Sequence, residues 1–179
     1  MVSLIEAARE PSYPVDIVLV LSNQPDAPGL ALARAAGVTA EAIDHRAFRG
    51  DRAAHEMALI QRLDAASVEI VCLAGYMRLL TPLMVNRFRG RMLNIHPSLL
   101  PAFPGLHTHA RAIAAAETCH GCTVHLVTEN MDEGPVLAQA AVPVLKGDTE
   151  ETLGARVLTR EHEIYPAALA AFATGLGLG

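Results

Sequence analysis

Short apolar runs alternate with helix-like segments along almost the whole chain. The run at residues 69–74, Glu-Ile-Val-Cys-Leu-Ala, is apolar after its first residue, as is typical of a parallel strand covered on both faces. A β-branched run at residues 15–21 ends at Ser22 and Asn23, which are turn-forming residues. Strands that alternate with helices predict an α/β fold, here a single doubly wound, mostly parallel sheet with helices on both faces.

The same pattern gives the expected positions of the elements. Strands are expected at residues 15–21, 38–43, 69–74, 92–95, 122–128 and 135–144. Helices are expected at residues 29–36, 55–63, from 81 onward, at 108–117 and over a long final segment. Thr108 is the expected cap of the fourth of these helices, and Asp148 or Thr149 that of the last. Pro166 is expected to bend or interrupt the final helix.

The beginning of the chain is unusual for this class. Residues 2–9 resemble the end of a helix, with Val2, Ile5 and Ala8 on one stripe, whereas such a domain usually opens with a strand and a turn. We therefore expect one domain over residues 1–179 that starts inside its first strand–helix unit and lacks the first strand.

Composition excludes several classes of function. The 179 residues are 51% hydrophobic and 18% charged, which is enough for a full-sized core. A net charge of −5 with scattered basic residues, and 4% aromatic residues without Trp, argue against nucleic-acid binding. No apolar run is long enough to span a membrane, and nothing resembles a signal peptide, so we expect a cytoplasmic protein with reduced thiols.

Three polar side chains fall at the ends of predicted strands. Asn94 and His96 end the strand at residues 92–95, and Asp132 lies in the turn-rich segment that follows residues 122–128. Ligands of open α/β sheets bind at such carboxyl ends. An amide can stabilise an oxyanion, an imidazole can relay a proton, and a carboxylate can orient the imidazole. The ordinary alternative is that all three merely end strands or form turns, as these residue types often do.

Other chemistry-bearing residues have ordinary explanations. His125, between Val124 and Leu126, is expected to be a hydrogen-bonded core histidine or to support the site from behind. Cys119 and Cys122 form a single C-x-x-C without the second ligand pair of a structural zinc site, so no metal is expected. The chain has no G-x-G-x-x-G, P-loop or G-x-S-x-G motif.

Several motifs together resemble one enzyme family. Residues 93–101 are Leu-Asn-Ile-His-Pro-Ser-Leu-Leu-Pro, residues 103–109 are Phe-Pro-Gly-Leu-His-Thr-His, and residues 132–135 are Asp-Glu-Gly-Pro. In this combination the chain resembles the phosphoribosylglycinamide formyltransferases (glycinamide ribonucleotide transformylases) over residues 4–173. The first and last motifs are shared by several enzymes that use 10-formyltetrahydrofolate, and the middle one is more specific.

The resemblance implies an activity and a mechanism. Such enzymes transfer a formyl group from 10-formyltetrahydrofolate to the amine of glycinamide ribonucleotide in purine synthesis. By resemblance, Asn94, His96 and Asp132 are catalytic. The amine attacks the formyl carbon directly, Asn94 and protonated His96 stabilise the oxyanion, and Asp132 pairs with His96 and assists proton transfer. The implied partners are these two small molecules, with no nucleic acid, membrane or metal, and the protein is expected to be a monomer or homodimer.

The resemblance also implies two sets of binding residues. The site of the folate co-substrate would be lined by apolar and backbone groups of two segments. They are Met77, Arg78, Leu79, Leu80 and Val85 on one side, and Val127, Thr128 and the residues up to Asp132 on the other. The nucleotide substrate would be held by Arg52, Pro97 and Glu161.

The chain departs from the family pattern at two places. The family begins with a strand and a G-x-G-S-N loop whose amides bind the substrate phosphate, and neither is in this sequence. Leu158 stands where a phosphate-contacting polar residue is common. Two alternatives follow, a formyltetrahydrofolate hydrolase that uses water as acceptor and a truncated, inactive folate-binding homologue. A methionyl-tRNA formyltransferase is disfavoured because the chain is short, acidic and without a tRNA-binding domain.

Overall fold

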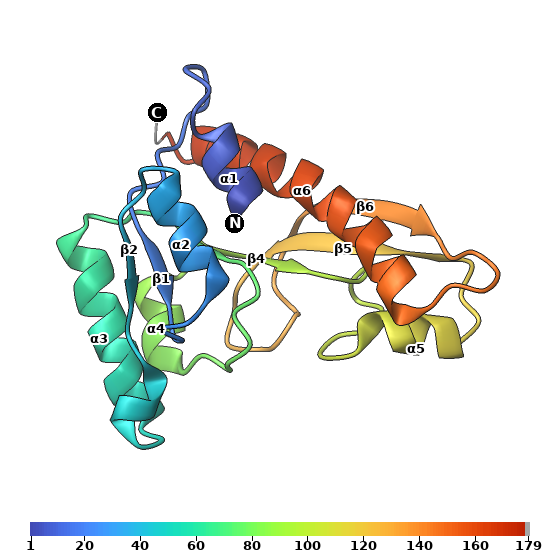
Figure 1. The fold of residues 1–179 in the computed structure, drawn as a ribbon, viewed down its shortest axis with the longest axis horizontal. Coiled ribbons are helices and arrows are strands. Elements are labelled where there is room, and N and C mark those ends of the chain that lie inside the picture. Colours follow the sequence, from blue (N-terminus) through green and yellow to red (C-terminus); the bar gives the residue numbers. More distant parts are fainter. Residues whose placement is uncertain (178–179) are drawn as a thin grey trace.

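The computed structural model describes residues 1–177, which form seven helical segments and six strands (Figure 1). In chain order the elements are α1 (Val2–Ala7), β1 (Val20–Ser22), α2 (Pro28–Ala35), β2 (Ala40–Ala42), the 3₁₀ helix η1 (His45–Phe48), α3 (Arg52–Ala65), β3 (Val71–Leu73), α4 (Pro82–Arg87), β4 (Met92–His96), α5 (Thr108–Ala114), β5 (Cys119–Leu126), β6 (Val136–Pro143) and α6 (Glu150–Gly175).

The strands form two sheets. β1 and β2 pair in parallel, and β3, β4, β5 and β6 form a four-stranded sheet in that order. Within it β3 and β4 are parallel, whereas β5 runs antiparallel to both β4 and β6. The predicted α/β class is confirmed. The sheet is mixed rather than mostly parallel, because β5 runs antiparallel to β4 and then forms a hairpin with β6, whose connection is too short for a parallel crossover.

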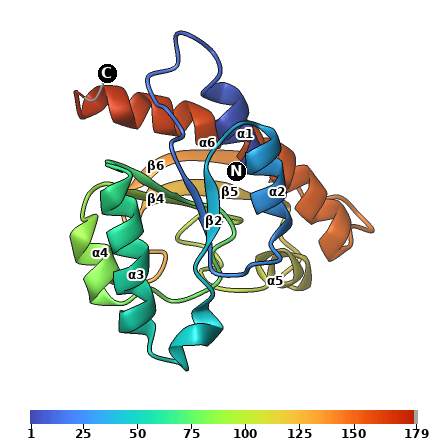
Figure 2. The same cartoon turned by 60° about the vertical axis from the view of Figure 1, so that its left-hand side comes forward.

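Helices cover both faces of the strands, as Figures 1 and 2 show. On one face, α1 and α6 place Leu4 and Leu169 against Leu93 and Val124. On the other face, α3 and α4 form a second cluster with Met92 of β4. Neighbouring residues of β4 therefore enter opposite cores, so a near-continuous apolar strand is required here.

Some expected boundaries differ from the structure. The strand expected at residues 15–21 pairs only over β1, and residues before it are extended without a ladder. Thr108 is not a cap, since His107 holds that position with φ of 56° and the Thr108 hydroxyl donates to the Pro97 carbonyl instead. Thr149 caps α6 through a reciprocal pair of hydrogen bonds with Thr152. α6 continues past Pro166 without interruption. None of the described helices is long and apolar enough to cross a bilayer.

One tyrosine ties α6 to the middle of the sheet. Tyr165 is 2% exposed, and its hydroxyl lies 2.9 Å from the Leu73 carbonyl of β3 and 3.2 Å from the Leu93 carbonyl of β4. Burial raises the pKa of this phenol well above its ordinary value, so the hydroxyl stays protonated and remains a donor. The bond links the last helix to two adjacent strands far apart in sequence.

We expect Tyr165→Phe to lower the free energy of unfolding by about 1 kcal/mol, because it removes a buried hydrogen bond whose acceptors keep their ladder partners. Urea denaturation measures this change. Tyr13→Phe is the matched control, since the Tyr13 hydroxyl bonds the Pro166 carbonyl from a half-buried position. An equal or larger loss in the control would contradict the role given to Tyr165.

Candidate active site

The candidate site lies where β4 ends beside β5. Asn94 and His96 are on β4, and the antiparallel register sets Asn94 opposite His125 and His96 opposite Thr123. The loop after β5 brings Asp132 back to the same place. The structure therefore brings together the three side chains that the sequence predicted to be catalytic.

Asp132 lies between two imidazoles. Its Oδ2 is 3.5 Å from His96 Nδ1, and its Oδ1 is 3.7 Å from His125 Nε2. The Gly105 amide donates to Oδ2 at 2.8 Å, and the carboxylate is only 9% exposed. Asp132 adopts a left-handed conformation with φ of 58°, which an Asp tolerates better than most residues. The loop thus holds a shielded negative charge against two groups that can become cations.

The hydrogen bonds of His96 define where its protons lie. Nε2 is 3.1 Å from the Phe103 carbonyl oxygen, which can only accept, so Nε2 carries a hydrogen. Nδ1 faces the Asp132 carboxylate, so a second proton there produces an imidazolium–carboxylate pair. His96 is 6% exposed, and in this low-dielectric position the pair has a stronger interaction than in water.

His125 orients the amide of Asn94. Its Nδ1 donates to the Leu126 carbonyl at 2.9 Å, which leaves Nε2 to accept from the Asn94 amide nitrogen at 3.2 Å. Burial lowers the pKa of His125 and favours this neutral acceptor form. The sequence indicated a hydrogen-bonded core or supporting histidine, and the structure agrees. His125 lies in the site because of the strand register between β4 and β5, and this register cannot be predicted from a single sequence.

Two backbone groups of the site gave no signal in the sequence. They are the Phe103 carbonyl and the Gly105 amide, both in the loop after β4. Buried hydrogen bonds hold this loop, because the Thr123 hydroxyl donates to the Ser98 carbonyl at 2.7 Å and accepts from the Leu100 amide at 3.0 Å.

Gly134 fixes the loop on the other side. A Cβ at Gly134 would lie 1.7 Å from the Leu126 carbonyl oxygen, a distance that no side chain can occupy. The glycine therefore allows the chain leaving Asp132 to pass against β5, and this explains the Asp-Glu-Gly-Pro motif.

The predicted folate-lining residues occupy two neighbouring segments. Leu80 and Val127 pack against the same buried cluster of α3 and α4. Met77 and Leu79 are 74% and 61% exposed, so their apolar surface is open to a ligand. Among the rest, Arg78 is half-buried, Val85 is buried on α4 and Thr128 is exposed.

A buried carboxylate anchors the first of these segments. Glu56 of α3 is 2% exposed and accepts hydrogen bonds from the amide and the hydroxyl of Thr81, the residue before α4. The exposed stretch that precedes Thr81 is thereby attached to a rigid helix.

The predicted nucleotide-binding residues are dispersed. Pro97 follows His96 directly, Arg52 is exposed at the start of α3, and Glu161 is half-buried on α6. Burial raises the pKa of Glu161. Within residues 1–177, no hydrogen bond or ion pair connects Arg52 or Glu161 with Asn94 or Asp132.

Two cysteines near the site do not form a ligand pair. Cys119 is exposed and Cys122 is buried, and a spacing of three along β5 places them on opposite faces. Across the described part of the chain, no group of three or more His, Cys, Asp or Glu side chains is arranged to hold a metal ion.

The comparisons with known proteins agree with an enzyme of the α/β class. The sequence profile of the formyl transferase family matches residues 1–169. Phosphoribosylglycinamide formyltransferase of Escherichia coli K12 is 44% identical over 173 residues, which are 97% of this chain and 81% of that protein. Trifunctional purine biosynthetic protein adenosine-3 of Bos taurus is 46% identical, but the chain spans only 17% of its length.

Solved structures give the same result. Phosphoribosylglycinamide formyltransferase of Brucella melitensis superposes with a TM-score of 0.92 at 56% identity, covering 97% of this chain and 88% of that one. Glycinamide ribonucleotide transformylase 1 of Symbiobacterium toebii has a TM-score of 0.94 at 49% identity, covering 97% and 82%. The chain belongs to the formyl transferase family.

A second histidine pair lies beside the site. His120 of β5 is 1% exposed, and its Nε2 is 3.1 Å from His109 Nδ1 of α5. The Phe103 ring packs edge-on against it. Burial, with smaller contributions from His109 and His96, lowers the pKa of His120 to about 4, while a bond with the Pro97 backbone opposes the shift.

This shift predicts acid sensitivity. Because the pKa of His120 is lower in the folded state, the unfolded chain binds more protons between about pH 4 and 6.5, and stability falls as the pH falls through that window. We expect His120→Gln to reduce the loss of unfolding free energy between pH 6.5 and 4.5 by about 2 kcal/mol. Urea titrations at both pH values measure it, with the exposed His162→Gln as control. An unchanged pH slope in H120Q would contradict the assignment.

Proposed function

We propose that this chain transfers the formyl group of 10-formyltetrahydrofolate to the amine of glycinamide ribonucleotide. The observation that carries the proposal is the buried cluster of Asn94, His96 and Asp132, with Asp132 Oδ2 3.5 Å from His96 Nδ1. The relatives of comparable length bear the name of this activity. We also propose that the protein acts in the cytoplasm on these small molecules, as a monomer or homodimer.

The proposed reaction proceeds by direct attack of the amine. The amine nitrogen bonds to the formyl carbon, and the carbonyl oxygen takes the electron pair as an oxyanion. The Asn94 amide donates one hydrogen to His125 and retains a second for the oxyanion. The imidazolium of His96 supplies positive charge beside it, held by Asp132.

Proton transfer completes the reaction. The attacking nitrogen becomes positively charged and must lose a proton, for which the Asp132 carboxylate is the acceptor, directly or through water. The bond between the formyl carbon and N10 of the folate then breaks, and N10 takes up the proton. The products are the formylated amide and tetrahydrofolate, so the charges and atoms balance.

The remaining predicted residues are assigned to binding. We assign the folate to the surface formed by Met77, Arg78, Leu79, Leu80, Val85, Val127 and Thr128, where exposed apolar side chains lie beside backbone groups. We assign the nucleotide to Arg52, Pro97 and Glu161 by their match to the family pattern.

An assay of the purified chain tests the activity. With 10-formyltetrahydrofolate present, we expect release of tetrahydrofolate that depends on glycinamide ribonucleotide. The change in absorbance of the folate measures this release. Release at the same rate without the acceptor would instead indicate a hydrolase. Folate binding without any release would indicate the inactive homologue, and either outcome would overturn the proposal.

Asp132→Asn tests the mechanism separately. We expect transfer to fall by about 10²- to 10⁴-fold, because the neutral amide neither accepts the proton nor holds the His96 imidazolium. Folate affinity, measured by isothermal titration calorimetry, should change only a few-fold. Asp26→Asn, at an exposed position, is the matched control. Unchanged turnover in D132N would remove Asp132 from the mechanism.

A further inference from the structure

The loop that follows β4 supplies two backbone groups to the candidate site. The Phe103 carbonyl oxygen lies 3.1 Å from His96 Nε2, and the Gly105 amide donates to Asp132 Oδ2 at 2.8 Å. Loops ordinarily move more than the strands that they connect. Backbone groups that orient the side chains of a site therefore need contacts that hold their loop in place.

The backbone of Phe103 is strained. Its φ of 53° lies in the left-handed region, which a bulky residue rarely adopts. Such a conformation persists only where the surrounding structure holds it. A return to an ordinary φ would rotate the peptide group that carries the carbonyl and so move its oxygen away from His96. The hydrogen bond to His96 therefore depends on whatever fixes this residue.

The Phe103 ring contacts side chains of two regular elements. From β5, the His120 ring packs edge-on, with the ring centres 6.0 Å apart and 75° between the planes. From α5, the Arg111 guanidinium carbon lies 5.4 Å from the ring centre, a cation–π contact. His120 is itself 1% exposed and lies 3.1 Å from His109 of α5. The ring is therefore held against both a strand and a helix.

The backbone on either side of Phe103 is also bonded. Arg111 Nη1 donates to the Pro104 carbonyl at 2.6 Å, and the Ser98 hydroxyl donates to the Ala102 carbonyl at 2.6 Å. The carbonyls before and after that of Phe103 are therefore both engaged. Arg111 thus holds the loop twice, at the ring of one residue and at the backbone of the next.

These contacts explain the motif at residues 103–109. Phe103 supplies the ring, and Gly105, with φ of 77°, supplies the amide that reaches the carboxylate. Thr108 anchors the start of α5 through its hydroxyl, and His109 bonds the imidazole against which the phenyl ring packs. The motif therefore specifies a loop that is attached at several points beside the candidate site.

We propose that Phe103 is a positioning residue for the transfer reaction, because its ring fixes the carbonyl that holds His96 Nε2. The imidazole is rigid, so a bond at Nε2 also sets the direction of Nδ1, which faces Asp132. His120 and Arg111 hold the ring in turn. The inference rests on the proposed function, since it names the group that orients one of the three proposed catalytic residues.

Steady-state kinetics of the full chain test this role. We expect Phe103→Ala to lower kcat by about 10- to 100-fold, because a shift of about 1 Å in a catalytic group has an effect of that order. KM for 10-formyltetrahydrofolate and for glycinamide ribonucleotide should change by less than about threefold, since the residues assigned to binding stay in place. Phe103→Tyr keeps the ring and should retain kcat within about threefold.

NMR of the protein labelled with ¹⁵N-histidine tests the positioning directly, without substrates. The Nε2–H of His96 should give a slowly exchanging ring-proton signal, because a buried hydrogen bond slows exchange with water. Its absence from His96→Gln assigns the signal. We expect the signal to disappear in Phe103→Ala and to remain in Phe103→Tyr. Arg111→Met, which disturbs the loop from α5, should match Phe103→Ala in both signal and kcat.

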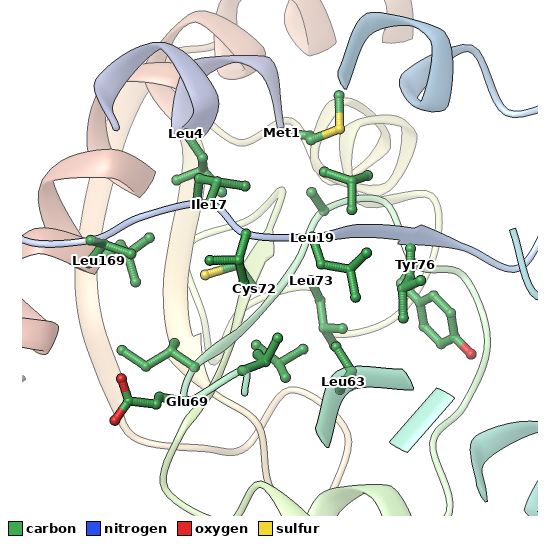
Figure 3. A pocket seen from close by; sticks show the side chains of 18 of the residues that line it. Met1, Leu4, Ile17, Leu19, Leu63, Glu69, Cys72, Leu73, Tyr76 and Leu169 are labelled. Carbon is green, nitrogen blue, oxygen red and sulfur yellow. The ribbon is translucent and has the colours of Figure 1, made fainter. Parts of the chain in front are cut away.

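Ile17→Ala is the matched control for lost apolar packing. Ile17 is half-buried like Phe103, but it lines the apolar cavity between β1 and β3 (Figure 3). None of residues 94–132 lines that cavity. This variant should therefore unfold at a lower temperature while it keeps the His96 signal and kcat.

Several results would overturn the proposal. They are an unaltered chain without the protected His96 signal, a signal that persists in Phe103→Ala, and equal losses in Phe103→Tyr and Phe103→Ala. A loss of kcat in Ile17→Ala as large as in Phe103→Ala, or a rise in KM in place of the fall in kcat, would do the same. If the unaltered chain transferred no formyl group, the proposed function would fail, and the NMR signals alone would decide whether Phe103 orients His96.

Discussion

The antiparallel register between β4 and β5 is the constraint on which the site depends. It sets Asn94 opposite His125, and the resulting 3.2 Å hydrogen bond fixes which end of the amide faces the reacting atoms. A slip of one residue would move every side chain of β4 to the other face and place Asn94 and His96 in the wrong core. The two buried residues that precede them in β4 oppose that slip, since Leu93 packs against α6 and Met92 packs in the α3–α4 cluster. Packing thus specifies the geometry of the candidate site.

Charge placement follows from this register. Asp132 reaches the site on a loop, where the Gly105 amide donates to it and two imidazoles lie within 3.7 Å of its oxygens. The two histidines are made unequal by their backbone partners. Both ring nitrogens of His125 are engaged in its neutral form, whereas His96 keeps one nitrogen toward the carboxylate. The free nitrogen of His96 therefore faces the single carboxylate at 3.5 Å, whereas His125 keeps its hydrogen bond to Asn94.

The sequence predicted most about the candidate site where residues with reactive side chains lie at the ends of predicted strands. Asn94 and His96 end an apolar strand, and ligands bind at such ends, so both could be predicted from one sequence. Contacts made by backbone atoms could not, because the Phe103 carbonyl and Gly105 amide carry no residue signature. The cap at Thr108 was predicted wrongly because a hydroxyl that serves a helix can equally bond a distant carbonyl, here that of Pro97. The antiparallel direction of β5 relative to β4 was likewise not predicted, because the connection through α5 is long enough for either direction.

The side chains of the candidate site that lie on strands belong to only one of the two sheets. Asn94, His96 and His125 all belong to the four-stranded sheet, and their hydrogen bonds involve neither β1 nor β2. β1 pairs in parallel with β2 in the other sheet, and the geometry that places Asp132 beside His96 and His125 is therefore set by the β4–β5 pair and the loop that follows it.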